Sequence, residues 1–347
     1  MHNPEFHLPD WARAHGSPLF QGQIKKTPDD FRVEEVLGFV PTGEGEHDFL
    51  RIEKTDSNTA WVARQLAAHA GVTARDIGYA GLKDRRAVTT QWFSVRRPAG
   101  DGTDWSTLQV NGVRLLEHTQ HRRKLKTGAH AGNRFRIVVR GIPGDRGQVD
   151  ERLAVMRASG VPNYFGPQRF GRHAHNLALA GEVFEGKRMK RDRRSIAISA
   201  ARSFIFNEVL SARVAGGSWS RLVSGEPANL DGSASIFVPT GEDDSLITRL
   251  QTLDIHPTGP LWGAGGTSVT GEIANLERTM ADEHRMLASG LERLGARPAR
   301  RALRLSVHDV AWSISGDRLE IGFHLGKGSF ATTVLRELMT TIDDNHS

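Results

Sequence analysis

Side chains that alternate between apolar and polar residues predict half-buried strands at residues 47–54, 88–95 and 132–140. In the third segment Asn133 and Phe135 share one face, because residues two apart on a strand point the same way. Residues 22–37 are also typical of extended chain, interrupted by a Pro-Asp-Asp turn. These segments predict a sheet.

Apolar residues at helical spacing predict helices elsewhere. The first begins after an N-cap at Ser57 or Asn58 and ends at Gly71. Longer amphipathic patterns occur at residues 173–186, 196–215 and 271–294. The pattern returns to a strand at residues 318–325, and Ser329 is the expected N-cap of a final helix.

Composition excludes several kinds of chemistry. The chain has 347 residues and no cysteine, which rules out disulfides, thiolate chemistry and cysteine-ligated metals. His173 and His175 are metal-ligand types, but no acidic cluster accompanies them, so we expect no metal. The glycine-rich runs at 263–266 and 326–329 lack the Walker and dinucleotide-binding spacings, so we expect no cofactor.

The chain has no segment with the roughly 20 apolar residues of a membrane span. Its first residues also lack the charged start and apolar run of an export signal. We therefore expect a cytoplasmic protein that does not enter a membrane.

Positive charge is concentrated in blocks. The formal net charge is +6, and residues 114–140, 187–194 and 293–304 contain many more basic than acidic side chains. A single block can be a solvated surface, but three together favour a phosphate backbone as the partner. The residues expected to contact that backbone are Lys83, Arg85, Arg122, Arg123, Lys124, Lys126, Lys187, Arg188, Lys190 and Arg191.

Residues 78–93 contain a single acidic residue, Asp84, next to three basic ones. Gly78 and Gly81 predict a tight connection before the next strand, so Asp84 should lie in a loop that enters a strand. An aspartate beside basic residues stays ionised at neutral pH and remains available as a nucleophile or an anchor. The alternative is a structural Asp84 that caps the turn and pairs with a neighbouring arginine.

The run Gly-Leu-Lys-Asp-Arg-Arg-Ala-Val-Thr-Thr-Gln at residues 81–91 closely resembles the signature of the TruD family of tRNA pseudouridine synthases. Further runs at residues 28–31, 132–135, 160–171 and 326–338 resemble other motifs of that family. The resemblance therefore extends over essentially the whole chain.

The resemblance implies the residues of the site. Asp84 occupies the position of the catalytic aspartate. An asparagine beside aromatic rings can hydrogen-bond a base edge or a ribose hydroxyl while the rings pack on the base. The residues expected to bind the substrate are Lys25, Phe31, Asn133, Phe135 and Phe330.

The implied fold class is α+β. Residues 1–158 and 304–347 would form a pseudouridine synthase catalytic domain with a mixed, largely antiparallel sheet. Residues 159–303 would form an inserted α/β domain, the TRUD domain, with a basic RNA-binding cleft between the two. We expect a monomer with tRNA as its partner and no protein partner.

The implied function is isomerisation of uridine to pseudouridine in tRNA, at position 13 of the D-arm. The reaction breaks the N1–C1′ bond and forms a C5–C1′ bond without net redox change or hydrolysis, so a carboxylate in a dry pocket can suffice. Asp84 either adds to C1′ or removes the 2′ proton, and the sequence leaves both routes open. The uridine must first be flipped out of its helix.

Two other classes of function remain open at this point. A hydrolytic RNA or nucleoside glycosidase would need a second acid to activate water, and Glu34 or Glu35 could serve. A noncatalytic RNA-binding protein would bind tRNA without forming a product.

Overall fold

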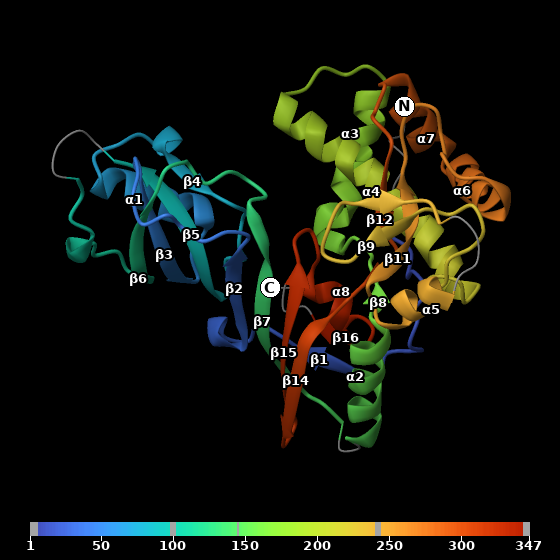
Figure 1. Ribbon diagram of the computed structural model, residues 1–347, viewed down its shortest axis with the longest axis horizontal. Helices are drawn as coiled ribbons and strands as arrows, with labels where there is room; N and C mark the ends of the chain where they lie inside the picture. Colours follow the sequence, from blue (N-terminus) through green and yellow to red (C-terminus); the bar gives the residue numbers. More distant parts are fainter. Residues whose placement is uncertain (1–5, 98–101, 144–145, 240–243, 343–347) are drawn as a thin grey trace. The chain divides into compact units, whose positions relative to one another are not determined.

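The computed structural model describes residues 6–97, 102–143, 146–239 and 244–342. The chain divides into two compact units (Figure 1). We call them the sheet unit (Phe20–Arg146, His308–Gly328 and Met339–Ser347) and the helical unit (Met1–Leu19, Gly147–Val307 and Ser329–Leu338). The predicted insertion, residues 159–303, lies within the helical unit, which also takes the start of the chain and residues 329–338.

The sheet unit is built on ten strands of the described residues in the order β14-β15-β7-β2-β5-β3-β6, with β1 beside β7 and β16 and with β4 beside β5. The pairs β2–β5 and β1–β16 are parallel and the others are antiparallel, which confirms the predicted mixed, largely antiparallel sheet. The strands are β1 (Phe20–Gln23), β2 (Phe31–Leu37), β3 (His47–Thr55), β4 (Ile77–Tyr79), β5 (Val88–Arg96), β6 (Val113–His121), β7 (His130–Arg140), β14 (His308–Ser315), β15 (Arg318–Gly326) and β16 (Met339–Ile342).

One face of this sheet forms the core of the unit. Helix α1 (Thr59–His69) lies beside β4 and β5, where Val62 and Leu66 join Leu50, Ile52 and Phe93 in one buried cluster. The apolar side chains that recur at helical spacing in α1 and at every second position in the strands are therefore the ones that are buried. Their burial fixes how the strands align with one another. We call this the core face.

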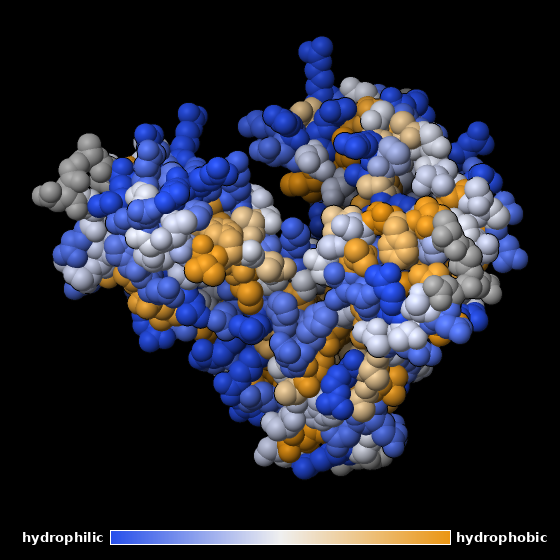
Figure 2. Space-filling model, viewed as in Figure 1, coloured by the Kyte–Doolittle hydropathy of each residue, from blue (hydrophilic) through white to orange (hydrophobic). Residues whose placement is uncertain are grey.

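Strand register continues the core face past α1 onto β2 and β7. Phe31 lies opposite Ile137, and Glu35 lies opposite Asn133, so these side chains project from the same side of the sheet. On the other side Arg51 pairs with Glu34 and further ion pairs follow along the strands, beside a smaller buried cluster that contains Phe49 and Trp92. Hydrophilic residues likewise cover much of the visible surface (Figure 2).

The helical unit has a core of its own, in which aromatic and aliphatic side chains of α3 and α4 pack together with α7. Its helices are α2 (Gly147–Ser159), α3 (His175–Phe184), α4 (Arg191–Ala215), α5 (Asp244–Gln251), α6 (Gly271–Glu283), α7 (Arg285–Arg293) and α8 (Ala331–Leu335). Its strands are β8 (Val161–Pro162), β9 (Ala228–Leu230), β10 (Ile236–Phe237), β11 (Ile255–Leu261), β12 (Ala299–Ala302) and β13 (Arg304–Leu305).

Two sequence predictions for this unit differ from the structure. Residues 271–294 form two helices because His284, at φ −111° and ψ 40°, leaves the helical conformation and packs its ring edge-on against Phe204, with centroids 4.9 Å apart. The final helix is N-capped by Phe330 and not by Ser329. In the described part of the chain no helix has the length and apolar character needed to cross a membrane.

Candidate active site

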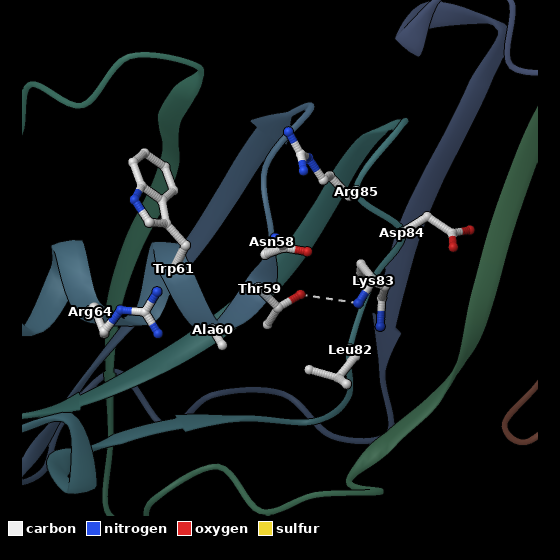
Figure 3. A pocket seen from close by; sticks show the side chains of 9 residues that line it. All are labelled: Asn58, Thr59, Ala60, Trp61, Arg64, Leu82, Lys83, Asp84 and Arg85. Carbon is white, nitrogen blue, oxygen red and sulfur yellow. Dashed lines mark hydrogen bonds between the residues drawn. The ribbon is translucent and has the colours of Figure 1, made fainter. Parts of the chain in front are cut away.

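The loop that carries Asp84 joins β4 to β5, as the sequence predicted, and is held by main-chain hydrogen bonds. The Lys83 amide donates to Thr59 Oγ1 over 3.0 Å (Figure 3), and the Gln91 amide nitrogen Nε2 donates to the Gly81 carbonyl over 3.3 Å. Thr59 in turn donates to Gln91 Oε1 over 2.8 Å. Helix α1 and strand β5 therefore fix both sides of the loop before any substrate binds.

Lys54 holds the same loop from the interior of the protein. Its side chain is fully buried, and its ammonium donates to the carbonyl oxygen of Asp84 over 2.9 Å and to that of Ser57 over 2.6 Å. Burial lowers the pKa of Lys54 from its usual 10.5 to about 8, against a smaller opposing effect of the Asp84 charge. A buried cation thus lies directly behind the loop, where it holds the backbone of Asp84 in place.

Lys83 is turned into the protein. Its ammonium pairs with Glu35 Oε2 over 2.6 Å, and both side chains are nearly or completely buried. The second Glu35 oxygen accepts the Trp92 amide over 3.1 Å. This differs from the phosphate-contacting role that we expected for Lys83 from its sequence neighbourhood, because its charge is already matched by Glu35 inside the protein.

The Asp84 side chain is 53% exposed and meets Lys25, whose Nζ lies 3.2 Å from Oδ2. The same Nζ lies 4.1 Å from the centroid of the Phe31 ring, a cation–π contact. Lys25 has φ +57°, a left-handed conformation that a lysine rarely adopts and that often marks functional sites. Phe31 packs edge-on against Phe135, with centroids 6.2 Å apart.

Asn133 is next to this group through its pairing with Glu35 on β2. Its Oδ1 is buried and has no hydrogen-bond partner among the described residues. A buried acceptor without a donor costs free energy, so a ligand that supplies an N–H or O–H would satisfy it.

The structure thus brings Asp84, Lys25, Phe31, Phe135 and Asn133 to one region of the sheet unit, although they come from three distant segments. Phe330 lies in the helical unit, where it packs partly buried against the core, and its contact with the nucleoside stays a prediction.

The expected phosphate-contacting residues are mostly exposed. Arg122, Arg123, Lys124 and Lys126 lie between β6 and β7, and Lys187, Arg188, Lys190 and Arg191 lie at the turn from α3 into α4. Several have protein partners on the surface: Arg122 pairs with Glu44, Lys187 with Glu182 and Arg85 with Asp56.

Part of the third basic block, at residues 293–304, is turned into the protein. Arg300 pairs with Glu277 over 2.7 Å through a side chain that is 8% exposed, and the buried Arg304 donates to the carbonyl oxygens of Leu250 and Ile255. Arg300 and Arg304 therefore hold the helical unit together, while Arg293 and Arg297 of the same block are exposed, so a phosphate contact of this block stays a prediction.

Comparison with known proteins agrees with this geometry. The family model described as tRNA pseudouridine synthase D (TruD) matches residues 13–191 and 186–338. The chain belongs to the TruD family. A TruD relative in Methylococcus capsulatus, named tRNA pseudouridine synthase D, is 48% identical over 95% of this chain and 94% of its own length. Another of that name in Hydrogenovibrio crunogenus is 43% identical over 97% of this chain and 98% of its own length.

The fold is also that of the TruD family. The crystal structure of the putative TruD protein from Methanosarcina mazei superposes with a TM-score of 0.74, covering 94% of this chain and 95% of that one at 21% identity. The predicted α+β pseudouridine synthase fold is confirmed.

Lys54 is the main residue of this TruD site that sequence reasoning missed. The signal was present, because the alternation that buries Leu50 and Ile52 places Lys54 on the same apolar face two residues later. A lysine on a buried strand face is unusual and needs a partner.

Proposed function

We propose that this TruD-family protein isomerises uridine to pseudouridine in tRNA, at position 13 of the D-arm, with Asp84 as the catalytic residue. The observation that carries the proposal is the setting of Asp84. Its carboxylate is half exposed and faces Lys25, while the rest of its loop is anchored by buried groups. Such anchoring holds a reactive group near its working geometry.

The flipped uracil would pack beside Phe31 and Phe135, with Asn133 Oδ1 accepting from the uracil N3–H or a ribose hydroxyl. Asp84 would either attack C1′ or remove the 2′ proton, and the N1–C1′ electron pair would leave with uracil. Lys25 would stabilise the anionic uracil. After rotation C5 bonds to C1′. In the first route the Asp84–C1′ bond breaks at this step and frees the carboxylate, and in the second route Asp84 returns the proton to C2′. The C5 proton is then lost and N1 gains a proton.

The arrangement gives less support to a hydrolytic glycosidase. Glu35 accepts from both Lys83 and the Trp92 amide in a buried position, and Glu34 pairs with Arg51 over 2.5 Å on the opposite face of the sheet. Neither carboxylate is placed to activate a water molecule beside Asp84.

The proposal includes a monomeric cytoplasmic enzyme that works without a cofactor. Its RNA backbone contacts would come from Arg85 and from the exposed residues at 122–126 and 187–191. Lys83 would act from inside the protein by holding Glu35.

The direct test is a tRNA transcript incubated with the purified protein. Pseudouridine has the mass of uridine, so conversion is mapped by carbodiimide-dependent stops of primer extension, and release of free uracil is measured in parallel. We expect a stop at position 13 and no uracil. Uracil release would favour the glycosidase, and salt-sensitive binding without either product would favour a noncatalytic RNA-binding protein.

A further inference from the structure

A pocket of about 550 Å³ lies beside the catalytic loop, on the side of α1. Trp61 and Arg64 of α1 line one side of the pocket and Leu82 and Arg85 of the loop line the other, with the start of α1 between them (Figure 3). Asp84 borders the pocket, but its carboxylate points away from it. The chemistry proposed above therefore leaves this pocket unused.

Leu82 is the first unusual feature of the pocket. It is 75% exposed, although it lies between Gly81 and Lys83, which are both held by hydrogen bonds to neighbouring elements. Its exposure is therefore fixed by the loop. A single exposed leucine needs no explanation, but this one lines a pocket together with a half-buried tryptophan.

The charges of the pocket are the second feature. Arg64 is exposed, and Arg85 is 64% exposed with Asp56 3.7 Å away. Because the Asp84 carboxylate points elsewhere, two guanidinium groups flank an apolar surface. Apolar and aromatic surface between cations is the combination that binds an unstacked nucleotide, whose base has a flat face and whose phosphate is anionic.

We propose that this pocket binds a nucleotide adjacent to the target uridine, with its base against Trp61 and Leu82 and its phosphate at Arg64 and Arg85. The inference rests on the proposed function. Flipping the uridine towards Asp84 removes the stacking partner of its neighbour, and the two apolar side chains supply a replacement. The pocket would then offset part of the cost of flipping and add a preference for the flanking base.

The test compares Leu82→Ala and Arg64→Gln with matched controls at exposed positions of the same unit, Leu116→Ala and, outside the basic blocks, Arg318→Gln. Pseudouridine formation is measured in single turnovers over a range of enzyme concentration on a tRNA transcript. We expect the concentration for half-maximal rate to rise roughly 5-fold or more in the pocket variants, as expected for losing a base contact, while the controls stay within about 2-fold. Trp61→Ala should act in the same way if its melting temperature shows that it folds.

A second arm uses transcripts with an abasic residue on the 5′ or the 3′ side of the target. On one of these transcripts the wild type should need a higher enzyme concentration for half-maximal rate, because the base that contacts Leu82 is missing. Leu82→Ala should then need the same concentration as the wild type, because both lack the contact between that base and Leu82. Pocket variants that match their controls on the intact transcript would overturn the proposal, as would a Leu82→Ala defect that persists on both abasic transcripts. A wild type that forms no pseudouridine would instead refute the proposed function.

Discussion

The ammonium of Lys54 donates a 2.9 Å hydrogen bond to the main-chain carbonyl oxygen of Asp84 from a fully buried position. The bond joins β3 to the loop before β5, and the same ammonium also holds the carbonyl of Ser57 ahead of α1. Lys54 therefore ties together the elements that position Asp84, the proposed catalytic residue, and its own side chain has no exposed surface.

Replacing Lys54 by methionine should slow catalysis more than it weakens binding. The substitution keeps the volume but leaves two carbonyl oxygens without their donor, so the loop can relax away from its working position. We expect the single-turnover rate at saturating enzyme to fall roughly 10-fold or more while the tRNA Kd changes less than about 3-fold. The exposed Lys26→Met is the matched control. A Lys54→Met protein with the wild-type rate would show that Lys54 has no positioning role.

The lowered pKa of Lys54 also predicts how stability depends on pH. Between pH 8 and 10.5 the unfolded chain keeps the Lys54 proton and the folded protein releases it, so stability rises with pH in this window. The cost of burying the charged form is fully present below about pH 8. The free energy of unfolding of the wild type relative to Lys54→Met should increase by about 2 kcal/mol between pH 7.5 and 9.5. Denaturant titrations of both proteins measure this difference, and a constant difference would contradict a lowered pKa.

Asn133→Ala should reduce activity without a large loss of stability. The Oδ1 atom has no hydrogen-bond partner in the described structure, so truncation removes no acceptor that the fold uses. The loss of one hydrogen bond to the substrate should lower kcat/KM by roughly 3- to 10-fold. Thermal melting and steady-state kinetics on one preparation distinguish the two effects. A large drop in melting temperature at unchanged kcat/KM would show instead that Asn133 stabilises the fold and does not bind the substrate.

Neutralising Arg188, Lys190 and Arg191 together should weaken tRNA binding and make it less sensitive to salt. Each lost phosphate contact should reduce the slope of log K against log salt concentration by about 0.7 to 0.9. The control is Arg249→Gln, whose side chain pairs with Asp254 on the same unit. An unchanged salt slope in the triple glutamine variant would remove these residues from the RNA interface.

Local patterns predicted a large part of the fold. The period-two segments became β3, β5 and β7, and the Gly-rich connection became the loop that carries Asp84. The sequence did not predict the helix break at His284, because apolar residues continue at helical spacing from α6 into α7. The contact between the His284 and Phe204 rings at this break is a tertiary interaction, which a local pattern does not contain.

The contacts within the site were not available from local patterns. Lys25 meets Asp84 because β2 pairs in parallel with β5, and a parallel pairing of segments so far apart in sequence cannot be read from either of them. Charge counts also could not separate the inward-facing side chains of Arg300 and Arg304 from the exposed arginines near α4, since burial depends on the partners that folding supplies.

The central claim is that the Asp84 carboxylate performs the chemistry and is not a structural cap. Its side chain is half exposed and pairs with Lys25 from another segment. Asp84→Asn keeps the shape of the side chain and removes its nucleophilic, basic oxygen. The loop should persist, because its anchors are Lys54, Thr59, Gln91 and Glu35.

The decisive measurement is single-turnover pseudouridine formation by Asp84→Asn at saturating enzyme, on a preparation whose melting temperature and tRNA Kd have been determined. We predict a melting temperature and a Kd close to those of the wild type and a rate lower by several orders of magnitude. A folded Asp84→Asn protein that binds tRNA and forms pseudouridine at a rate comparable to the wild type would contradict the catalytic role of Asp84.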